Sequence, residues 1–183
     1  MTTKQSLRAA AVARRAARTG EARVAAGEAL LRHGLAACAG ARCVAAYVGV
    51  GTEPPTVPLL DALHASGVRI LLPVIDGTDL DWAAYDGPAT LADRPLGLAE
   101  PVGARLGAEA VRDADVVLVP ALAVDRDGHR LGRGRGYYDR ALRTVIAPVI
   151  AVVYDDDVVN AVIVESHDRD VDGWVTPSGH YDR

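Results

Sequence analysis

The segment with the clearest chemical character is a loop rich in glycine and arginine. Residues 130–140 read RLGRGRGYYDR, with glycine at positions 132, 134 and 136. Glycines at alternate positions let the main chain approach a ligand closely and turn its N–H groups toward it. Arg133 and Arg135 add charge-assisted donors, and a helix expected to begin near Gly136 adds its positive end. We interpret this loop as a cradle for an anion, most naturally a polyphosphate.

Other interpretations of the same loop stay open at this point. Its glycine spacing matches neither the Walker loop nor the dinucleotide fingerprint, because no Gly-Lys-Ser/Thr follows. A flexible turn with solvated arginines is one alternative, and an RNA-binding Arg-Gly segment is another. RNA-binding segments of that type occur in long disordered tracts, whereas this loop is short. Tyr137 and Tyr138 favour a ligand site, because adjacent residues on a helix cannot both face the core.

The basic residues of this chain are almost all arginine. Of the 20 Lys and Arg residues, 19 are Arg, and Lys4 is the only lysine. Lysine presents a compact point charge and arginine a planar fork, so the two are not equivalent around a phosphate. Lys4 is therefore a candidate phosphate ligand. The alternative is a chance residue at a frayed terminus.

Length and composition indicate one domain, residues 1–183. The net charge of −4 argues against a general nucleic-acid binder. Cys38 and Cys43 fit neither a disulfide framework nor a four-ligand zinc site, so we expect buried thiols in the reducing cytoplasm. No apolar run approaches the roughly 20 residues of a membrane span, and arginines interrupt the N-terminal alanines where a secretory signal would be apolar. We expect a cytoplasmic monomer without nucleic-acid or membrane partners.

Apolar and helical segments alternate along the chain. The expected helices are 3–18, 21–35, 57–65 and one starting near 136; the expected strands are 43–48, 68–73, 79–85, 115–120, 149–154 and 173–177. A small hairpin is expected at 123–131 and an irregular excursion at 86–110. The alternation predicts an α/β fold, a three-layer Rossmann-like sheet, mainly parallel, with helices on both faces. Ligands bind at the carboxyl ends of such strands, which brings together the loops 49–55, 121–136 and 155–172.

Four motifs, in order, resemble the 5-formyltetrahydrofolate cyclo-ligase family. The main one is VPALAVD at 119–125, followed by GxRLGRGxGYYD at 128–139. The others are Lys4-x-x-Leu7-Arg8, the segment from Tyr47 to Glu53, and His167-Asp168-x-x-Val171-Asp172. The chain departs from the family pattern at Ala121, where Gly is common, and at Val124, where an aromatic is common. Neither departure removes a charged participant.

The resemblance implies an enzyme that uses ATP and Mg²⁺ to convert 5-formyltetrahydrofolate into 5,10-methenyltetrahydrofolate, through an iminium phosphate, with release of ADP and phosphate. Lys4 and Arg8 would contact the ATP phosphates, and the loop would wrap the nucleotide through Arg130, Leu131, Gly132, Arg133, Gly134, Arg135, Gly136, Tyr137 and Tyr138. Arg133, Arg135 and Tyr138 would be catalytic. The folate would be bound by Glu53, Val48, Trp82, Tyr137 and Tyr138, with the alignment of Trp82 loose. Asp139 and Asp172 would hold Mg²⁺.

These residue types suit phosphoryl transfer, which needs positioning and charge stabilisation more than covalent help. On the residues alone, Asp139 fits a surface ion pair with Arg143, four positions along the helix, as well as it fits a metal ligand. Glu53 fits an ordinary solvated acid in a loop as well as a folate ligand. The run Asp155–Asp157 is expected to be a solvated loop or helix start. Rival functions are a sugar-phosphate isomerase or CoA-transferase-like enzyme on a related sheet, a non-catalytic folate or nucleotide binder, and an enzyme for a different formylated compound.

Overall fold

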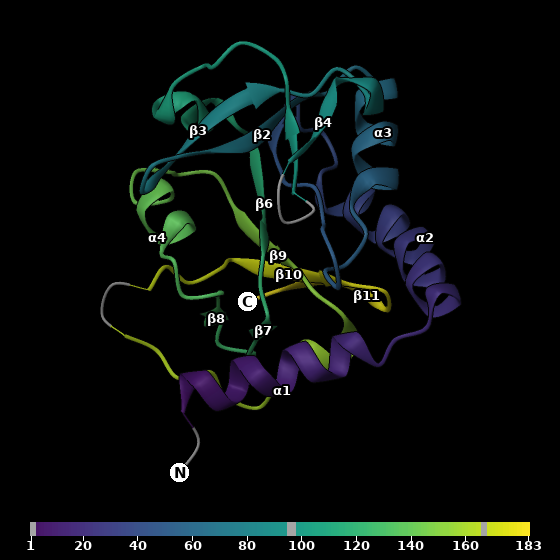
Figure 1. Cartoon of the computed structure of the whole chain (residues 1–183), viewed down its shortest axis with the longest axis vertical. Coiled ribbons are helices and arrows are strands. Elements are labelled where there is room, and N and C mark those ends of the chain that lie inside the picture. Colours follow the sequence, from purple (N-terminus) through teal and green to yellow (C-terminus); the bar gives the residue numbers. More distant parts are fainter. Residues whose placement is uncertain (1–2, 95–97, 166–167) are drawn as a thin grey trace.

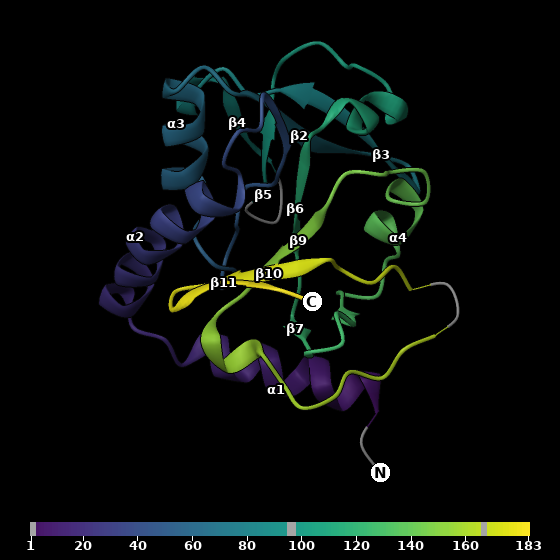
Figure 2. The same cartoon turned by 180° about the vertical axis from the view of Figure 1, so that it is seen from behind.

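The computed structural model describes residues 3–94, 98–165 and 168–183. Its centre is a seven-stranded sheet in the order β11-β10-β9-β6-β1-β2-β3 (Figures 1 and 2). The strands are β1 (Cys43–Ala45), β2 (Arg69–Asp76), β3 (Asp79–Ala84), β6 (Val116–Pro120), β9 (Val149–Val152), β10 (Gly173–Thr176) and β11 (Gly179–Asp182). The central strands are parallel, and the edge strands β3 and β11 are antiparallel to their neighbours. The predicted α/β sheet, mainly parallel, is confirmed.

Alternate residues of the central strands enter two separate cores. Val116 and Leu118 pack on one face, together with side chains of α2 and α3, whereas Val117 and Val119 pack on the other. Because successive side chains of a strand point to opposite faces, a strand covered on both sides must be apolar throughout. This is why the central strands read as continuous apolar runs.

Helices cover both faces of the sheet. The helices are α1 (Lys4–Ala16), α2 (Gly20–Ala37), α3 (Val57–Ala65) and α4 (Tyr137–Ala141), with 3-10 turns at Pro88–Thr90, Ala108–Asp113 and Asp155–Asp157. α2 and α3 cover one face (Figure 1), and α4 packs near the 3-10 turn at Ala108–Asp113 on the other. α1 lies across the end of the sheet where β6 finishes, packed on Leu122 and Leu131. None of the described helices is long and apolar enough to cross a bilayer.

Some elements differ from those expected. The helix after Gly136 is only five residues long, so its positive end is weaker than predicted. Segment 86–110 contains the hairpin β4 (Leu91–Arg94) and β5 (Leu98–Pro101), and β11 was not expected. The small hairpin is confirmed as β7 (Ala123–Val124) and β8 (Arg130–Leu131). Both cysteines are free and buried as expected, and burial raises the pKa of Cys38 to about 12, which keeps its thiol protonated.

Candidate active site

A cavity lies at the carboxyl ends of β1, β2 and β6. It has a volume of about 390 Å³, and its lining includes the last part of β2 and the segments that follow β1 and β6. The aliphatic part of the wall comes from Val48, Leu72, Ile75, Leu80 and Leu122, and the polar groups include Arg15, Tyr47, Glu53, Arg130, Arg133, Tyr137, Tyr138 and Asp139. An apolar pocket with a few convergent polar groups is the usual form of a small-molecule site. We call it the main cavity.

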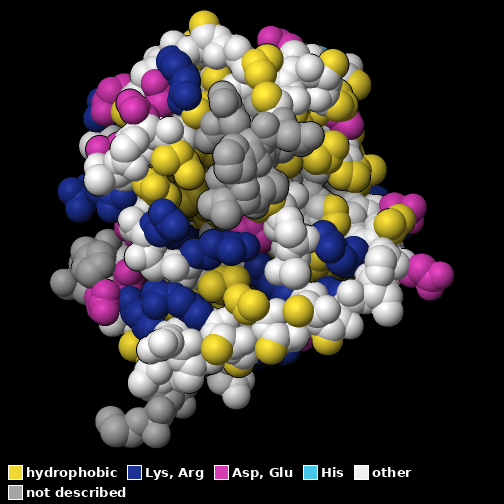
Figure 3. All heavy atoms as spheres, viewed as in Figure 1, with side chains coloured by type: hydrophobic (Ala, Val, Ile, Leu, Met, Phe, Trp, Pro, Cys, Tyr) yellow, Lys and Arg dark blue, Asp and Glu magenta, His cyan; other side chains and the backbone are white. Residues whose placement is uncertain are grey.

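A second, smaller cavity of about 100 Å³ lies where α1 meets the glycine loop. Its lining is Lys4, Arg8, Arg130, Leu131, Gly132, Gly134, Gly136, Asp139, Glu165 and Asp168. Arg130, Asp139 and the three loop glycines line both cavities, so the two spaces adjoin along the loop. In Figure 3, Lys and Arg side chains gather between α4 and α1 on this face. We call this space the small cavity.

The glycine loop packs directly against Arg8 of α1. Arg8 Nε donates to the Gly132 carbonyl over 2.9 Å. Gly134 has a φ of +93°, and a Cβ built there would lie 3.3 Å from Cζ of Arg8. The left-handed backbone favours glycine at position 134, and a side chain there would also displace the Arg8 guanidinium slightly.

Lys4 faces two carboxylates of the segment before β10. Its Nζ lies 2.7 Å from Asp168 Oδ2 and 3.2 Å from Glu165 Oε2. Burial lowers the pKa of Lys4, but the hydrogen bonds to Asp168 and Glu165 outweigh that effect and raise the pKa above its ordinary value. The lysine is therefore held in its charged form at the edge of the small cavity.

Arg130 separates the two cavities and is almost fully buried. Its Nη2 lies 2.5 Å from Asp139 Oδ1, and its guanidinium carbon lies 6.0 Å from the ring centroid of Tyr138. Its Nε is buried and has no hydrogen-bond partner among the described residues. A buried donor without an acceptor is costly, so Arg130 carries an unsatisfied donor at the boundary between the two cavities.

Glu53 places a buried carboxylate in the main cavity. The residue is 7% exposed; its Oε2 accepts from the Val50 N–H over 3.0 Å, and its Oε1 accepts from Arg133 Nε over 3.1 Å. Burial and the negative charge of Glu53 raise the pKa of Tyr138, against the opposing charge of Arg130. Tyr138 is therefore a neutral phenol that can donate hydrogen bonds within the site.

Comparison with known proteins identifies this architecture. The model of the 5-formyltetrahydrofolate cyclo-ligase family matches residues 1–177. The chain belongs to that family. The cyclo-ligase of Mycolicibacterium smegmatis is 47% identical over 144 residues, 74% of either chain, and that of Escherichia coli K12 is 30% identical over 75% of this chain and 79% of its own. These family matches make the chain a ligase.

Solved structures agree with the family assignment. The 5,10-methenyltetrahydrofolate synthetase of Aquifex aeolicus superposes with a TM-score of 0.84 at 29% identity, covering 99% of this chain and 93% of that chain. The synthetase of Mycoplasma pneumoniae, at 18% identity, has a TM-score of 0.75 over 93% of this chain and 96% of its own, and supports the fold alone. The predicted family membership is confirmed.

Most residues predicted for the cyclo-ligase site line the two cavities. Lys4, Arg8 and Leu131 line the small cavity, and Val48, Glu53, Arg133, Arg135, Tyr137 and Tyr138 line the main one. Arg130, Gly132, Gly134, Gly136 and Asp139 line both. Arg133 and Arg135 line the main cavity and not the small cavity, which Lys4 and Arg8 line.

Two predicted ligands lie elsewhere. Trp82 is 0% exposed, belongs to the core beneath β3 and is not part of the cavity lining, where Leu80 takes its place. Asp172 directly precedes β10, at the amino end of the parallel strands, and its Oδ2 accepts from the Val149 N–H over 2.9 Å. Asp172 is not part of the lining of either cavity, whereas Asp139 lines both. His167 lies outside the described residues.

Sequence reasoning missed two features of the cyclo-ligase site. Arg15 of α1 is 2% exposed and lines the main cavity, held by Asp157, which is 0% exposed. The run Asp155–Asp157 was expected to be a solvated loop or helix start; it is a 3-10 turn in which Asp155 and Asp156 are exposed and only Asp157 is buried. Glu165 and Asp168 were not assigned to the site although Asp168 stood in a quoted motif. The spacing of residues along the sequence gave no indication that Arg15 is buried at the site, because its partner Asp157 is 142 positions away.

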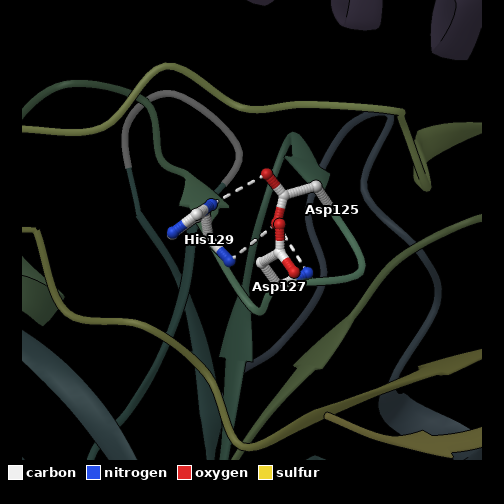
Figure 4. A group of neighbouring side chains, drawn as sticks. All are labelled: Asp125, Asp127 and His129. Carbon is white, nitrogen blue, oxygen red and sulfur yellow. Dashed lines mark hydrogen bonds and ion pairs between the residues drawn. The ribbon is translucent and has the colours of Figure 1, made fainter.

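A cluster of Asp125, Asp127 and His129 has the spacing of a metal site, with potential ligand atoms within 4.8 Å of one another (Figure 4). The Asp125 carboxylate already accepts from the N–H groups of Asp127, His129 and Val162, and contacts His129 Nδ1 at 2.9 Å. A carboxylate has about four lone-pair sites, and these contacts use them. The hydrogen bonds of Asp125 hold the hairpin β7–β8 against the chain at Val162. This agrees with the structural role expected for Asp125 and Asp127.

The two departures from the cyclo-ligase pattern lie close to the site. Ala121 is 5% exposed and lines the main cavity, where its carbonyl accepts from Arg15. Val124 is 0% exposed and packs in the core. A larger aromatic at position 124 would need additional core volume, so the valine is a packing difference that leaves the cavity lining unchanged.

Proposed function

We propose that this chain converts 5-formyltetrahydrofolate into 5,10-methenyltetrahydrofolate at the expense of one ATP, with Mg²⁺ as the metal. The observation that carries the proposal is the contact between the two cavities along Arg130, Asp139 and the loop glycines. A phosphoryl donor in the small cavity and a formylated folate in the main cavity would meet at this boundary. Direct transfer of a phosphoryl group requires such adjacency.

The small cavity suits a polyphosphate. Lys4, Arg8 and Arg130 surround it with positive charge, and the glycines at 132, 134 and 136 give the phosphate oxygens access to main-chain N–H groups. Phosphoryl transfer is accelerated chiefly by donors placed where charge develops. Arg133 and Arg135, on the same loop but facing the main cavity, would reach the transferred group from the folate side.

Asp139 and Asp168 are the residues that would hold Mg²⁺. Both line the small cavity beside the cationic groups, and Mg²⁺ is usually bound by one or two carboxylates together with phosphate oxygens. In this proposal Asp168 takes the role first expected of Asp172. The ion would neutralise charge on the phosphate chain, and Lys4 would exchange part of its contact with Asp168 for a phosphate oxygen.

The main cavity suits the pterin part of a folate. Its aliphatic wall, which includes Val48, Leu72 and Leu80, can pack on a planar ring, and Glu53 offers a buried acceptor for the ring's N–H and amino groups. The neutral phenol of Tyr138 lines the same cavity, within the influence of Glu53 and Arg130, and would donate to the formyl group. The substrate would enter with its formyl oxygen toward the loop.

The reaction proposed for these residues is the one that the family resemblance implies. The formyl oxygen of an amide is a poor leaving group, and transfer of the γ-phosphoryl group to it gives an iminium phosphate and ADP. Nitrogen 10 attacks the formyl carbon and forms the new C–N bond. The C–O bond breaks, phosphate leaves with the oxygen, and the proton of nitrogen 10 is released. Arg133, Arg135 and the loop N–H groups would stabilise the charge on the phosphoryl oxygens.

The proposal is tested by the absorbance of 5,10-methenyltetrahydrofolate in acidified samples. Product is expected with 5-formyltetrahydrofolate, ATP and Mg²⁺ together, and not when any one is omitted, with one ADP formed per product. A non-catalytic binder would bind folate without product, and an isomerase would show no folate-dependent ATP hydrolysis. ATP hydrolysis with another formylated compound alone would indicate a different substrate.

A further inference from the structure

Arg15 is an arginine in the wall of the main cavity for which the proposed reaction has no use. Its Nε donates to Asp157 Oδ2 over 2.9 Å, and its Nη2 contacts the same carboxylate and donates to the Ala121 carbonyl. Among the described residues, the remaining terminal nitrogen, Nη1, has no protein acceptor. The Nε and Nη2 atoms of Arg15 are thus held by the protein, and the N–H groups of Nη1 can still donate to a ligand.

The surroundings of Arg15 determine the kind of ligand atom it can bind. Asp157 is 0% exposed, pairs also with Arg14 at 3.2 Å and accepts from the Tyr154 N–H. The contacts with Asp157 and with the Ala121 carbonyl hold the guanidinium in one orientation. A guanidinium N–H fixed in this way can donate to a carbonyl oxygen of a ligand.

Arg15 and Glu53 present complementary groups to the same cavity. Tyr154 connects them, because its hydroxyl donates to the Glu53 carbonyl over 3.2 Å and its ring centroid lies 5.7 Å from Cζ of Arg15. The pair offers one buried acceptor and one buried donor. The pyrimidine edge of a 4-oxo pterin offers the matching set, the 2-amino group and N3–H as donors and the 4-oxo oxygen as acceptor.

We propose that Arg15 selects pterins that carry a 4-oxo group, with Nη1 donating to that oxygen while Glu53 accepts from N3–H and the 2-amino group. This inference rests on the proposed function, which places the pterin in the main cavity. A 4-amino pterin places a donor against the donor of Arg15 and lacks the proton at N3. A site built around a hydrogen-bonded group rejects analogues that cannot complete the bond.

The test is binding of two reduced folates that differ only at position 4, measured by calorimetry without ATP. The parent chain is expected to bind the 4-oxo form at least about 10-fold more tightly than the 4-amino form, the value of one hydrogen bond to a charged group. In the double variant Arg15→Met with Asp157→Leu, 4-oxo binding is expected to fall about 10- to 100-fold, while 4-amino binding does not weaken. Replacing Asp157 together with Arg15 avoids a buried carboxylate that keeps Arg14 as its remaining ion-pair partner.

Arg14→Met is the matched control. Arg14 contacts the same Asp157 carboxylate but is not part of the cavity lining, so the preference for the 4-oxo form should persist. If the double variant does not fold, Arg15→Lys keeps a cation for Asp157 but lacks the second terminal nitrogen, and the same loss of preference is expected. Equal weakening of both ligands, or equal binding by the parent chain, would overturn the inference.

Failure of the proposed function would look different. The parent chain would then form no methenyl product, although it could still bind the 4-oxo folate with the Arg15-dependent preference. Because the binding measurement needs neither ATP nor turnover, the two results are independent.

Discussion

Arg133 and Glu53 form an ion pair that joins the glycine loop to the loop after β1. Arg133 Nη2 lies 3.0 Å from Glu53 Oε1, and the Arg133 side chain is 58% exposed whereas that of Glu53 is 8% exposed. The glutamate is thus fixed and the arginine is the partner that can move. A pterin that uses Glu53 must share or displace Arg133, which frees the guanidinium for a phosphoryl oxygen.

Arg133→Ala should therefore lower kcat about 100-fold or more, the usual loss of one donor aimed at developing charge. The KM for the folate should not rise, because the competitor for Glu53 is removed. Steady-state kinetics of methenyl formation measure both constants, with Arg143→Ala, an exposed arginine beyond the cavity lining, as control. A parental kcat in Arg133→Ala would contradict the role of Arg133.

Lys4→Ala should raise the KM for ATP and lower kcat/KM at least about 10-fold, as expected for loss of a charge-assisted contact. Lys4→Arg should recover only part of this, because a planar fork is not equivalent to a point charge. Gln5→Ala, on the same turn of α1 and exposed, should behave as the parent. Equal kinetics in Lys4→Ala and Gln5→Ala would remove Lys4 from the phosphate site.

Gly134→Ala separates backbone strain from site geometry. A non-glycine residue in the left-handed region costs roughly 1–2 kcal/mol, and at 134 the new Cβ also meets Arg8. Gly40→Ala has a similar φ of +80° but no atom within 4 Å of the new Cβ. Thermal unfolding should show a comparable loss of stability in both variants, and only Gly134→Ala should lose ATP-dependent activity. Full activity in Gly134→Ala would show that the loop tolerates displacement of Arg8.

His129 should stabilise the fold at acidic and not at alkaline pH. Its hydrogen bond to Asp125 raises the pKa of His129, against the opposing effect of burial. Burial would raise the pKa of Asp125, but hydrogen bonds from Val162 and His129 lower it below its ordinary value. The His129 contribution is therefore full below its unfolded pKa of about 6.5 and is lost as pH rises through the raised value.

The measurement is denaturant unfolding of the parent and of His129→Gln at pH 6 and pH 9. The variant should lose free energy of unfolding at pH 6, by no more than about 1 kcal/mol for a partly exposed ion pair. The loss should be smaller at pH 9. An equal loss at the two pH values would contradict the protonated pair.

The buried strands and the glycine loop could be predicted because their signals are local. Val116–Pro120 is apolar at every position, which only a strand buried on both faces requires. The helix after Gly136 was expected to be longer, but β-branched Thr144, Val145 and Ile146 and the nearby Pro148 disfavour its continuation. β11 was missed because its sequence, GHYD, has no apolar alternation.

The predicted residues that do not line the two cavities differ from the expectation in direction and distance. Asp172 directly precedes the expected strand 173–177, so the sequence already places it at the amino end of that strand. Trp82 and Leu80 share a face of β3, and only the three-dimensional packing decides that Leu80 reaches the cavity and Trp82 does not. Arg15 could not be found, because nothing local pairs residue 15 with residue 157.

The claim on which this account depends is that the small cavity holds the phosphates and the main cavity the folate. The most direct measurement is a crystal structure of the chain with a non-hydrolysable ATP analogue, Mg²⁺ and 5-formyltetrahydrofolate. We predict the triphosphate between Lys4, Arg8 and the main-chain N–H groups of Gly132–Gly136, and the formyl oxygen next to its terminal phosphate. A triphosphate bound away from Lys4 and this loop would contradict the account.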